Sequence, residues 1–197
     1  MVAPTPAAAI LAGGRARRFG GRDKSRLVID GRPIIIGQME VLHRVAHEIF
    51  IVGPRADLYA DVGLVVYADL LPDHGALGGL YTALEVAHAD YVLVVACDLP
   101  FLEAPLLERL ADRARGRDGA WVRTTRGPEP LLACYRRQSR FAVLSRLRAG
   151  ALKAADLATA LDLAELDEHE VETFGRVERL LANVNSPEDF ARIESSR

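Results

Sequence analysis

Short apolar runs alternate with stretches of helical periodicity along this chain. A continuous apolar run of four to six residues, closed by glycine, proline or a polar cluster, is typical of a buried strand. Such strands are expected at 7–11, 27–29, 48–52, 63–67, 91–96, 120–124 and 131–135, with an edge strand at 171–174. Apolar residues at helical spacing predict helices over 33–45, 77–87, 105–115, 141–147 and 152–163, and a last helix after Ser186 and Pro187.

This alternation of strands and helices predicts the fold class. Strands that are separated by helices favour an α/β, three-layer αβα domain around a mostly parallel, Rossmann-like sheet. The chain has 197 residues and contains no repeat, low-complexity tract or evident linker. We therefore expect a single domain that covers residues 1–197.

Polar residues follow two of the predicted strands. The first apolar run ends at Gly13 and Gly14, and the run at 91–96 ends at Cys97 and Asp98. In open α/β sheets the ligand binds beyond the carboxyl ends of the strands. The two strand ends therefore predict one shared site.

The segment after the first strand is rich in glycine and in positive charge. Its glycines allow the backbone to approach a ligand and to point N–H groups at an anion. Against the single acid Asp23 it carries six cations, which are Arg15, Arg17, Arg18, Arg22, Lys24 and Arg26. It matches neither the P-loop pattern nor the dinucleotide GxGxxG pattern. We interpret it as a polyphosphate-binding loop, and the alternative is a solvated basic loop.

The composition of the chain argues against several classes of protein. The formal net charge of −2 provides no overall basic field for nucleic acid. Cys97 and Cys134 lack metal-ligand spacing and lie in apolar runs, which suits buried thiols in a reducing compartment. The start of the chain lacks a signal-peptide pattern, and no run reaches the ~20 apolar residues of a membrane span. We expect a cytoplasmic protein that binds neither membrane nor nucleic acid.

Several segments together resemble one family of nucleotidyltransferases. The matching segments are Leu11-Ala12-Gly13-Gly14, Arg18-Phe19-Gly20-Gly21, Asp23-Lys24, Gly75-Ala76-Leu77-Gly78-Gly79, Cys97-Asp98-Leu99-Pro100, Glu129-Pro130-Leu131-Leu132-Ala133 and Asn183-Val184-Asn185-Ser186-Pro187-Glu188. In this combination and order they are similar to the molybdenum cofactor guanylyltransferase (MobA) family. The resemblance implies a sheet of the nucleotide-diphospho-sugar transferase type. It also implies Mg²⁺-dependent transfer of GMP from GTP to molybdopterin, with release of pyrophosphate.

The resemblance also implies roles for individual residues. Nucleotide contacts are expected from Leu11, Ala12, Gly13, Gly14, Gly21, Lys24, Asp69, Gly75, Gly79 and Asp98. The catalytic residues would be Lys24, Arg18 and Asp98, with Asp98 as the metal ligand. The acceptor-binding residues would be Asn183, Asn185 and Lys153. The family usually carries a basic cluster near residue 150, where this chain has only Lys153, and often carries Asn where this chain has Gly53. The implied partners are GTP, molybdopterin and, transiently, other proteins of molybdenum cofactor biosynthesis.

The implied reaction requires charge stabilisation rather than a general base. A phosphate monoester has a second pKa near ~6, so it is already an anionic nucleophile at neutral pH. The approach of two polyanions is opposed by charge repulsion, which cations must offset. Lys24 and Arg18 suit that role, and one or two carboxylates suffice for Mg²⁺. A structural alternative remains for Asp98, as a helix N-cap, and for the two asparagines, as turn and capping residues.

Two other functions remain open from the sequence. The first is a cytidylyltransferase, or another nucleotidyltransferase, acting on molybdopterin or another small phosphorylated acceptor. The second is a non-catalytic nucleotide-binding module with the same fold, although Lys24 and Asp98 are both present. The acidic residues between Asp162 and Glu170 are interpreted as a solvated face.

Overall fold

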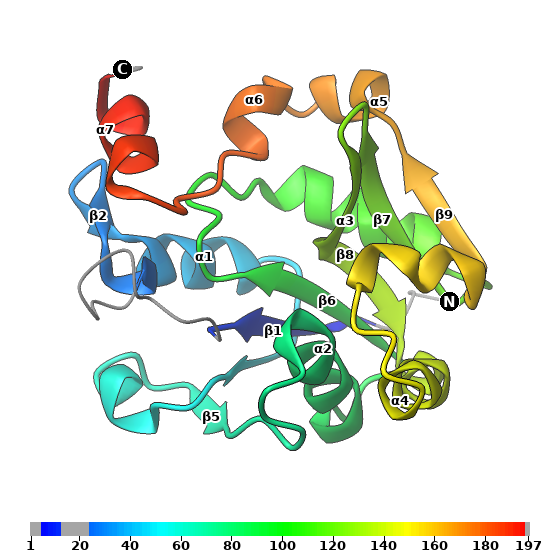
Figure 1. Ribbon diagram of the computed structural model, residues 1–197. Coiled ribbons are helices and arrows are strands. Elements are labelled where there is room, and N and C mark those ends of the chain that lie inside the picture. The colour runs from blue at the N-terminus through cyan, green and yellow to red at the C-terminus, as the bar shows by residue number, and fades with distance from the viewer. Residues whose placement is uncertain (1–4, 13–23, 196–197) are drawn as a thin grey trace.

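A seven-stranded sheet forms the middle layer of the protein (Figure 1). The computed structural model describes residues 5–12 and 24–195. The strand order is β5-β4-β1-β6-β8-β7-β9. The neighbours from β5 to β6 are parallel, β8 is antiparallel to both β6 and β7, and β9 is parallel to β7. The predicted mostly parallel sheet is confirmed.

The elements follow the alternation expected from the sequence. The strands are β1 (Ala7–Leu11), β2 (Val28–Ile29), β3 (Arg32–Pro33), β4 (Glu48–Val52), β5 (Val65–Tyr67), β6 (Tyr91–Ala96), β7 (Gly119–Thr124), β8 (Gly127–Arg136) and β9 (Leu163–Leu166). The α-helices are α1 (Ile34–Leu42), α2 (Gly75–Val86), α3 (Ala104–Ala114), α4 (Arg140–Arg148), α5 (Glu168–Glu172), α6 (Val177–Leu180) and α7 (Pro187–Ser195). Short 3₁₀ helices are η2 (Lys24–Arg26), η3 (Ala56–Tyr59), η4 (Arg137–Ser139) and η5 (Ala154–Thr159).

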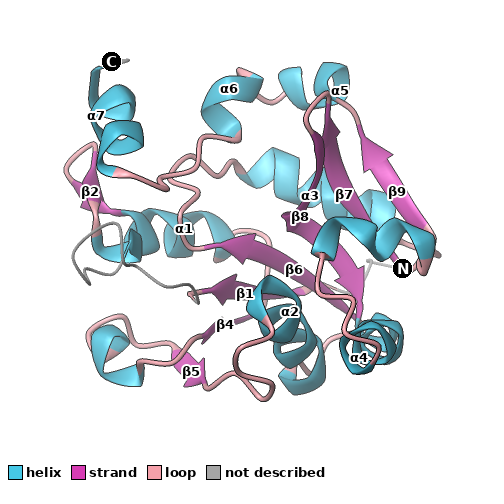
Figure 2. Ribbon diagram, viewed as in Figure 1, coloured by secondary structure: helices cyan, strands magenta, loops and turns pink. Residues whose placement is uncertain are grey.

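Helices cover both faces of the sheet (Figure 2). On one face, α1 and α3 bury apolar side chains such as Ile35 and Leu107 against the strands. On the other, α2 and α4 do the same with Leu80 and Val143. Because successive side chains of a strand point to opposite faces, each strand contributes to both cores. The three-layer αβα architecture is therefore confirmed.

The middle of the sheet determines where the site lies. Strand β1 lies between β4 and β6, and all five of its residues are buried. Its last residue, Leu11, is in register with Val52 of β4 and Ala96 of β6. The three strands therefore end at the same level, and the loops that follow them emerge side by side.

The region between α4 and α7 differs from the sequence prediction. The predicted helix over 152–163 contains only the 3₁₀ helix η5, and the chain then enters β9. The predicted edge strand over 171–174 is wrong, because residues 168–172 form α5. The Asp167 side chain accepts a hydrogen bond from the Glu170 N–H at 2.8 Å, which caps this helix.

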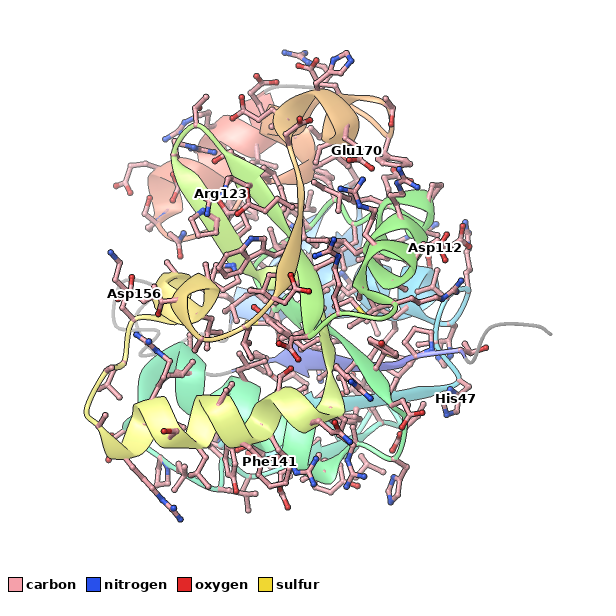
Figure 3. All side chains as sticks on the ribbon, turned by 90° about the vertical axis from the view of Figure 1, so that its right-hand side faces the viewer. His47, Asp112, Arg123, Phe141, Asp156 and Glu170 are labelled. Atoms are coloured by element: carbon pink, nitrogen blue, oxygen red, sulfur yellow. The ribbon has the colours of Figure 1, made fainter. Side chains whose placement is uncertain are left out.

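The acidic residues of this region are also more structured than expected. Glu165 of β9 pairs with Arg123 of β7 at 2.6 Å, and Glu170 of α5 pairs with Arg109 and Arg113 of α3. Figure 3, viewed from the β9 edge, shows Arg123 and Glu170 in this part of the molecule. The predicted solvent exposure is confirmed for Asp162, Glu165 and Asp167. The ion pairs of Glu165 and Glu170 were not expected, and they connect β9 and α5 to the sheet and to α3.

The last helix packs against a segment from the first fifth of the chain. Helix α7 lies beside the β2–β3 hairpin (Figure 1), where Ile29, Ile34 and Val184 form a small apolar cluster with Phe190 and Ile193. This contact brings the segment before α7 toward the carboxyl ends of the central strands. Within the described part of the chain, no helix is both long enough and apolar enough to cross a membrane.

Candidate active site

Three side chains that are far apart in the sequence meet beyond the carboxyl end of β6. The Lys24 ammonium donates a hydrogen bond to Oδ2 of Asp98 at 3.3 Å and one to Oδ1 of Asn185 at 2.7 Å. The side chains of Lys24 and Asp98 are only 22% and 16% exposed, so their ion pair is partly shielded from water. The structure thus brings together two of the three predicted catalytic residues and one predicted acceptor residue.

The Lys24 end of this contact is held by the turn that follows the glycine-rich loop. Ser25 is fully buried, and its hydroxyl lies 3.2 Å from the Tyr59 hydroxyl. Arg26 pairs with Asp61, with Nη1 at 2.9 Å from Oδ2, and also donates to the Leu58 carbonyl. Arg26, one of the six predicted cations, therefore fixes the end of the loop to the segment after η3.

The Asp98 loop is held from two sides. The buried Gln38 of α1 donates from Nε2 to the carbonyls of Ala96 at 2.8 Å and Leu99 at 2.9 Å, which flank Asp98. The Cys97 N–H donates to the carbonyl of Leu11 at the end of β1. Helix α3 begins only at Ala104, so Asp98 is not its N-cap and the structural alternative for this residue is excluded.

Gln38 has a positioning role that the sequence analysis missed. It is 1% exposed and lies on the apolar face of α1, between Ile35 and Leu42. A polar residue in the middle of such a face needs hydrogen-bond partners, and its amide nitrogen finds two in the loop that carries Asp98, whereas its Oε1 has none among the described residues. A single amide within an otherwise apolar helix face was the signal in the sequence.

The Asn185 end of the contact is held through the backbone. The Val184 N–H donates to the Asp98 carbonyl at 3.0 Å, so the two segments touch directly. Ser186 caps α7, as predicted, by accepting from the Asp189 N–H at 3.2 Å, and the Asp189 carboxylate accepts from the Asn185 N–H at 3.1 Å. The neighbouring Asn183 donates to the Leu181 carbonyl at 3.3 Å.

The predicted nucleotide contacts at the end of β1 lie at the same edge of the sheet. Leu11 is 6% exposed, and a Cβ added to Gly79 of α2 would lie 3.4 Å from its side chain. A Cβ on Gly53 would lie 3.1 Å from the Ala12 carbonyl oxygen, so a larger residue there would require the end of β1 to shift slightly. Gly53 therefore permits the close approach of two strand ends.

Asp69 and Gly75 belong to the turn that leads into α2. The Asp69 carboxylate accepts hydrogen bonds from the Leu71 N–H at 3.0 Å and the Thr82 hydroxyl at 2.9 Å. Gly75 has a φ of +60°, a conformation that favours glycine. Asp69 therefore connects the segment before α2 to Thr82 within that helix, and Gly75 is the first residue of the helix. The expected contact of both residues with a nucleotide stays a prediction.

The remaining predicted residues fall into two groups. Gly13, Gly14, Arg18 and Gly21 lie outside the described residues. Lys153 has a 76% exposed side chain and pairs with Asp156 of its own segment at 3.8 Å. Among the described contacts, none joins Lys153 to Asn183 or Asn185, and its role toward an acceptor stays a prediction.

Glu129 is an acidic residue that the sequence analysis quoted but did not assign. It lies near the start of β8, the antiparallel neighbour of β6. Burial raises the pKa of the Glu129 carboxyl, Arg126 opposes this shift, and the negative charge of Asp98 adds to it. Its side chain has neither a hydrogen bond nor an ion pair within the described part of the chain. Glu129 and Asp98 are therefore close enough for their charges to interact.

The donor set fits a hard divalent cation. Mg²⁺ prefers carboxylate and carbonyl oxygens, usually one or two from the protein, with phosphate oxygens and water completing its shell. Asp98 and Asn185 supply such oxygens, and the lysine ammonium that they hold shows that this point attracts positive charge. The arrangement can bind a cation together with a polyanion, as a nucleotidyl transfer requires.

Comparison with known proteins agrees with this geometry. The chain matches the MobA-like NTP transferase domain over residues 8–165, which is most of its length. The chain belongs to the MobA-like NTP transferase family. The match ends at residue 165. Asn183 and Asn185 therefore lie beyond the matched domain.

One curated relative and two solved structures illustrate the similarity. A probable molybdenum cofactor guanylyltransferase from Haloferax mediterranei is 31% identical, over 95% of this chain and 92% of the relative. The crystal structure of molybdopterin-guanine dinucleotide biosynthesis protein A from Archaeoglobus fulgidus has a TM-score of 0.78 at 24% identity, and covers 96% of this chain and 97% of that one. The 2-C-methyl-D-erythritol 4-phosphate cytidylyltransferase from Thermus thermophilus has a TM-score of 0.70 at 18% identity, and covers 97% and 98%. At these identities the two structures show the shared fold.

Proposed function

We propose that this MobA-like NTP transferase transfers GMP from GTP to the phosphate of molybdopterin, forming molybdopterin guanine dinucleotide and pyrophosphate. The observation that carries the proposal is the Lys24 ammonium bound to both Asp98 and Asn185 beyond the end of β6. The description of the Haloferax mediterranei relative as a guanylyltransferase supports the choice of donor.

The chemistry follows from the charges of the reactants. An oxygen of the acceptor phosphate attacks the α-phosphorus of GTP, the new P–O bond forms, and the bond to the β-phosphate oxygen breaks to release pyrophosphate. The acceptor phosphate is already anionic at neutral pH, so no side chain has to remove a proton. Lys24, with Arg18 as a second proposed cation, stabilises the negative charge that develops on the transferred and leaving phosphates.

Asp98 would hold Mg²⁺, which supplies charge neutralisation for the triphosphate when it is bound. Leu11, Ala12 and Gly79 would contact the nucleoside at the strand ends. Asn183, Asn185 and Lys153 remain the proposed acceptor contacts, of which Asn185 shares the Lys24 ammonium with Asp98. The cytoplasmic location and transient contacts with other proteins of molybdenum cofactor biosynthesis likewise remain proposals.

Release of pyrophosphate tests this proposal directly. Purified protein mixed with GTP, Mg²⁺ and molybdopterin should release pyrophosphate and form the dinucleotide, and Asp98→Ala should abolish both. Asp112→Ala, which removes an exposed carboxylate from α3, serves as the matched control and should retain activity. Binding of GTP without any turnover would instead support a non-catalytic nucleotide-binding module.

A further inference from the structure

A pocket lies at the edge of the sheet opposite to the candidate active site. Its volume is about 260 Å³, and it lies where β6 begins, β8 ends and α4 starts. The residues that line it include Arg136, Arg137 and Arg140, with Asp90, Tyr91 and Phe141. Strand β6, which is about 20 Å long at ~3.3 Å per residue, separates this pocket from Asp98. The pocket is therefore distinct from the candidate active site.

The three arginines give the pocket an excess of positive charge, against the single acid Asp90 in its lining. Arg136 is exposed, and among the described residues no hydrogen bond or ion pair involves its guanidinium. Arg137 donates from Nη2 to the Glu85 carbonyl at only 3.5 Å, and its Nε is buried without a hydrogen-bond partner in the described part of the chain. A buried donor without an acceptor is costly, so Arg137 needs an acceptor that these residues do not supply.

Arg140 is the arginine that the protein holds in place. Its guanidinium lies over the Phe141 ring at 4.3 Å, pairs with Glu85 of α2 at 3.1 Å and donates to the Arg137 carbonyl at 3.2 Å. Figure 3 shows Phe141 on α4, where its ring is 64% exposed. Because these contacts fix the plane of the guanidinium, Arg140 loses little conformational freedom when it binds a ligand.

The start of α4 adds to the positive potential of the pocket. No side chain caps this helix, and the hydroxyl of the N-cap residue Ser139 donates to the Asp118 carbonyl instead. The first turn contains no acidic residue and begins with Arg140. Positive charge at a helix N-terminus opposes the helix dipole, whereas an anion there is stabilising. An anion in this pocket would therefore relieve an unfavourable arrangement of charges.

We propose that this pocket is a second anion-binding site, which binds the phosphoryl group of a small ligand such as pyrophosphate. Guanidinium groups bind phosphate oxygens through paired hydrogen bonds, and one phosphoryl group offers acceptors to several arginines at once. The volume is smaller than the ~300 Å³ at which pockets for larger organic ligands begin. The ligand is therefore either a free short phosphate compound or the phosphates of a nucleotide whose base stays outside. This site does not depend on the proposed function.

Nuclear magnetic resonance of the arginine Nε–H groups tests the site in the intact protein. Each Nε–H group gives its own signal, so binding in this pocket is distinguished from binding near Asp98. Titration with pyrophosphate, without divalent cations, should shift the signals of Arg137 and Arg140 with a Kd of about 1 mM or tighter. Acetate at equal concentration should shift them much less, because it carries less charge and fewer acceptor oxygens.

Two single substitutions of exposed arginines provide the matched comparison. Arg136→Gln should weaken pyrophosphate binding, followed through the Arg140 signal, by about tenfold. Arg148→Gln removes an exposed arginine from the last turn of the same helix and should change the affinity by less than about twofold. Circular dichroism melts establish that both variants are folded, and pyrophosphate should raise the Tm of Arg148→Gln more than that of Arg136→Gln.

A parallel titration with GTP distinguishes the two sources of the phosphoryl group. Tighter binding of pyrophosphate at the Arg137 and Arg140 signals would assign a free diphosphate, and tighter binding of GTP would assign the phosphates of a nucleotide. Unchanged signals at about 10 mM of both ligands would overturn the proposal. Equal affinities for pyrophosphate and acetate, or equal effects of Arg136→Gln and Arg148→Gln, would overturn it as well. Because no transfer reaction is measured, such a failure leaves the proposed function untouched.

Discussion

At the scale of single residues, Lys24 carries the clearest kinetic expectation. Its charge should stabilise the transition state more than the bound substrates, because negative charge moves toward the departing pyrophosphate during the reaction. We expect Lys24→Ala to lower kcat by about 10²–10³-fold and to raise KM for GTP much less. Steady-state pyrophosphate release at saturating molybdopterin measures both quantities. A variant with an unchanged kcat and only a raised KM would contradict this role.

Glu129 carries an expectation about stability and pH. Burial and the nearby Asp98 raise the pKa of its carboxyl above 4.5, despite the opposing Arg126, so the folded protein holds this proton more tightly than the unfolded chain. The free energy of unfolding then falls as the pH rises from 4.5 through the raised pKa. Above that pKa the full loss of stability that ionised Glu129 causes is present. Glu129→Gln should therefore be more stable than the unmodified protein at about pH 7.5, and this advantage should vanish below pH 4.5.

Urea denaturation of Glu129→Gln at several pH values measures the effect. Glu108→Gln is a suitable control, because Glu108 is exposed on α3, and it should change the free energy of unfolding by less than about 0.5 kcal/mol at any of these pH values. A Glu129→Gln protein whose stability relative to the unmodified protein did not depend on pH would show that Glu129 is not strained in the folded state.

At the scale of elements, the sequence predicted the parts of the site that local patterns encode. The apolar runs that became β1 and β6 end where the structure places Leu11 and Asp98, and Ser186 caps α7 as expected. A site shared by Lys24 and Asp98 was expected as well, because each follows the end of a predicted strand, but their direct contact and the pairing of β1 with β6 come from the structure. Asn185 joins them through tertiary packing alone, with 161 positions of sequence separation from Lys24.

The elements that the sequence analysis missed form only because of contacts with distant parts of the chain. Strand β9 has only four residues and exists because it pairs with β7. The apolar residues of η5, Ala154 and Leu157, have the spacing of three that α-helices and 3₁₀ helices share. Glu129 and Gln38 were missed because their importance depends on Asp98, which is distant from both in the sequence and becomes their neighbour only in the fold.

The segment before α7 carries an expectation about how the site is held. Val184 is fully buried against Ile29 and Ile34, and its N–H binds the Asp98 carbonyl. Val184→Ala should lower the free energy of unfolding by about 2 kcal/mol, from the lost apolar burial and the resulting cavity. It should also weaken GTP binding in the presence of Mg²⁺ by about tenfold, because Asn185 would no longer be held beside Lys24.

Val177→Ala separates the two effects of Val184→Ala. Val177 is 7% exposed and packs within the larger core beside α3 rather than in the cluster beside α7. Its truncation should reduce stability by a similar amount and leave the GTP affinity, measured by calorimetry below the melting temperature, nearly unchanged. Equal losses of GTP affinity in both variants would mean that the segment before α7 affects binding only through overall stability.

At the scale of the whole molecule, the fold determines where a ligand can bind but does not select the base. The same architecture is found in a guanine dinucleotide biosynthesis protein and in a cytidylyltransferase. In open α/β sheets of this kind, ligands bind at the carboxyl ends of the central strands whichever base they carry. We therefore expect selection between guanine and cytosine to come from local groups at the end of β1 and in α2, where Gly79 lies against the Leu11 side chain.

Thermal stability in the presence of each nucleotide measures that selection for the intact protein. A ligand that binds only the folded chain, at about 100 times its Kd, adds about 2.7 kcal/mol to the free energy of unfolding, which for a chain of this size raises Tm by roughly 5–10 °C. With Mg²⁺ present, we expect GTP to produce a shift of this size and ATP, CTP and UTP at equal concentration to produce much less. Asp98→Ala should reduce the GTP shift strongly, since the cation that accompanies the triphosphate would lose its carboxylate. Stabilisation by CTP in place of GTP would assign the protein to cytidylyl transfer, with Lys24 and Asp98 in the same roles, because neither residue is expected to contact the base.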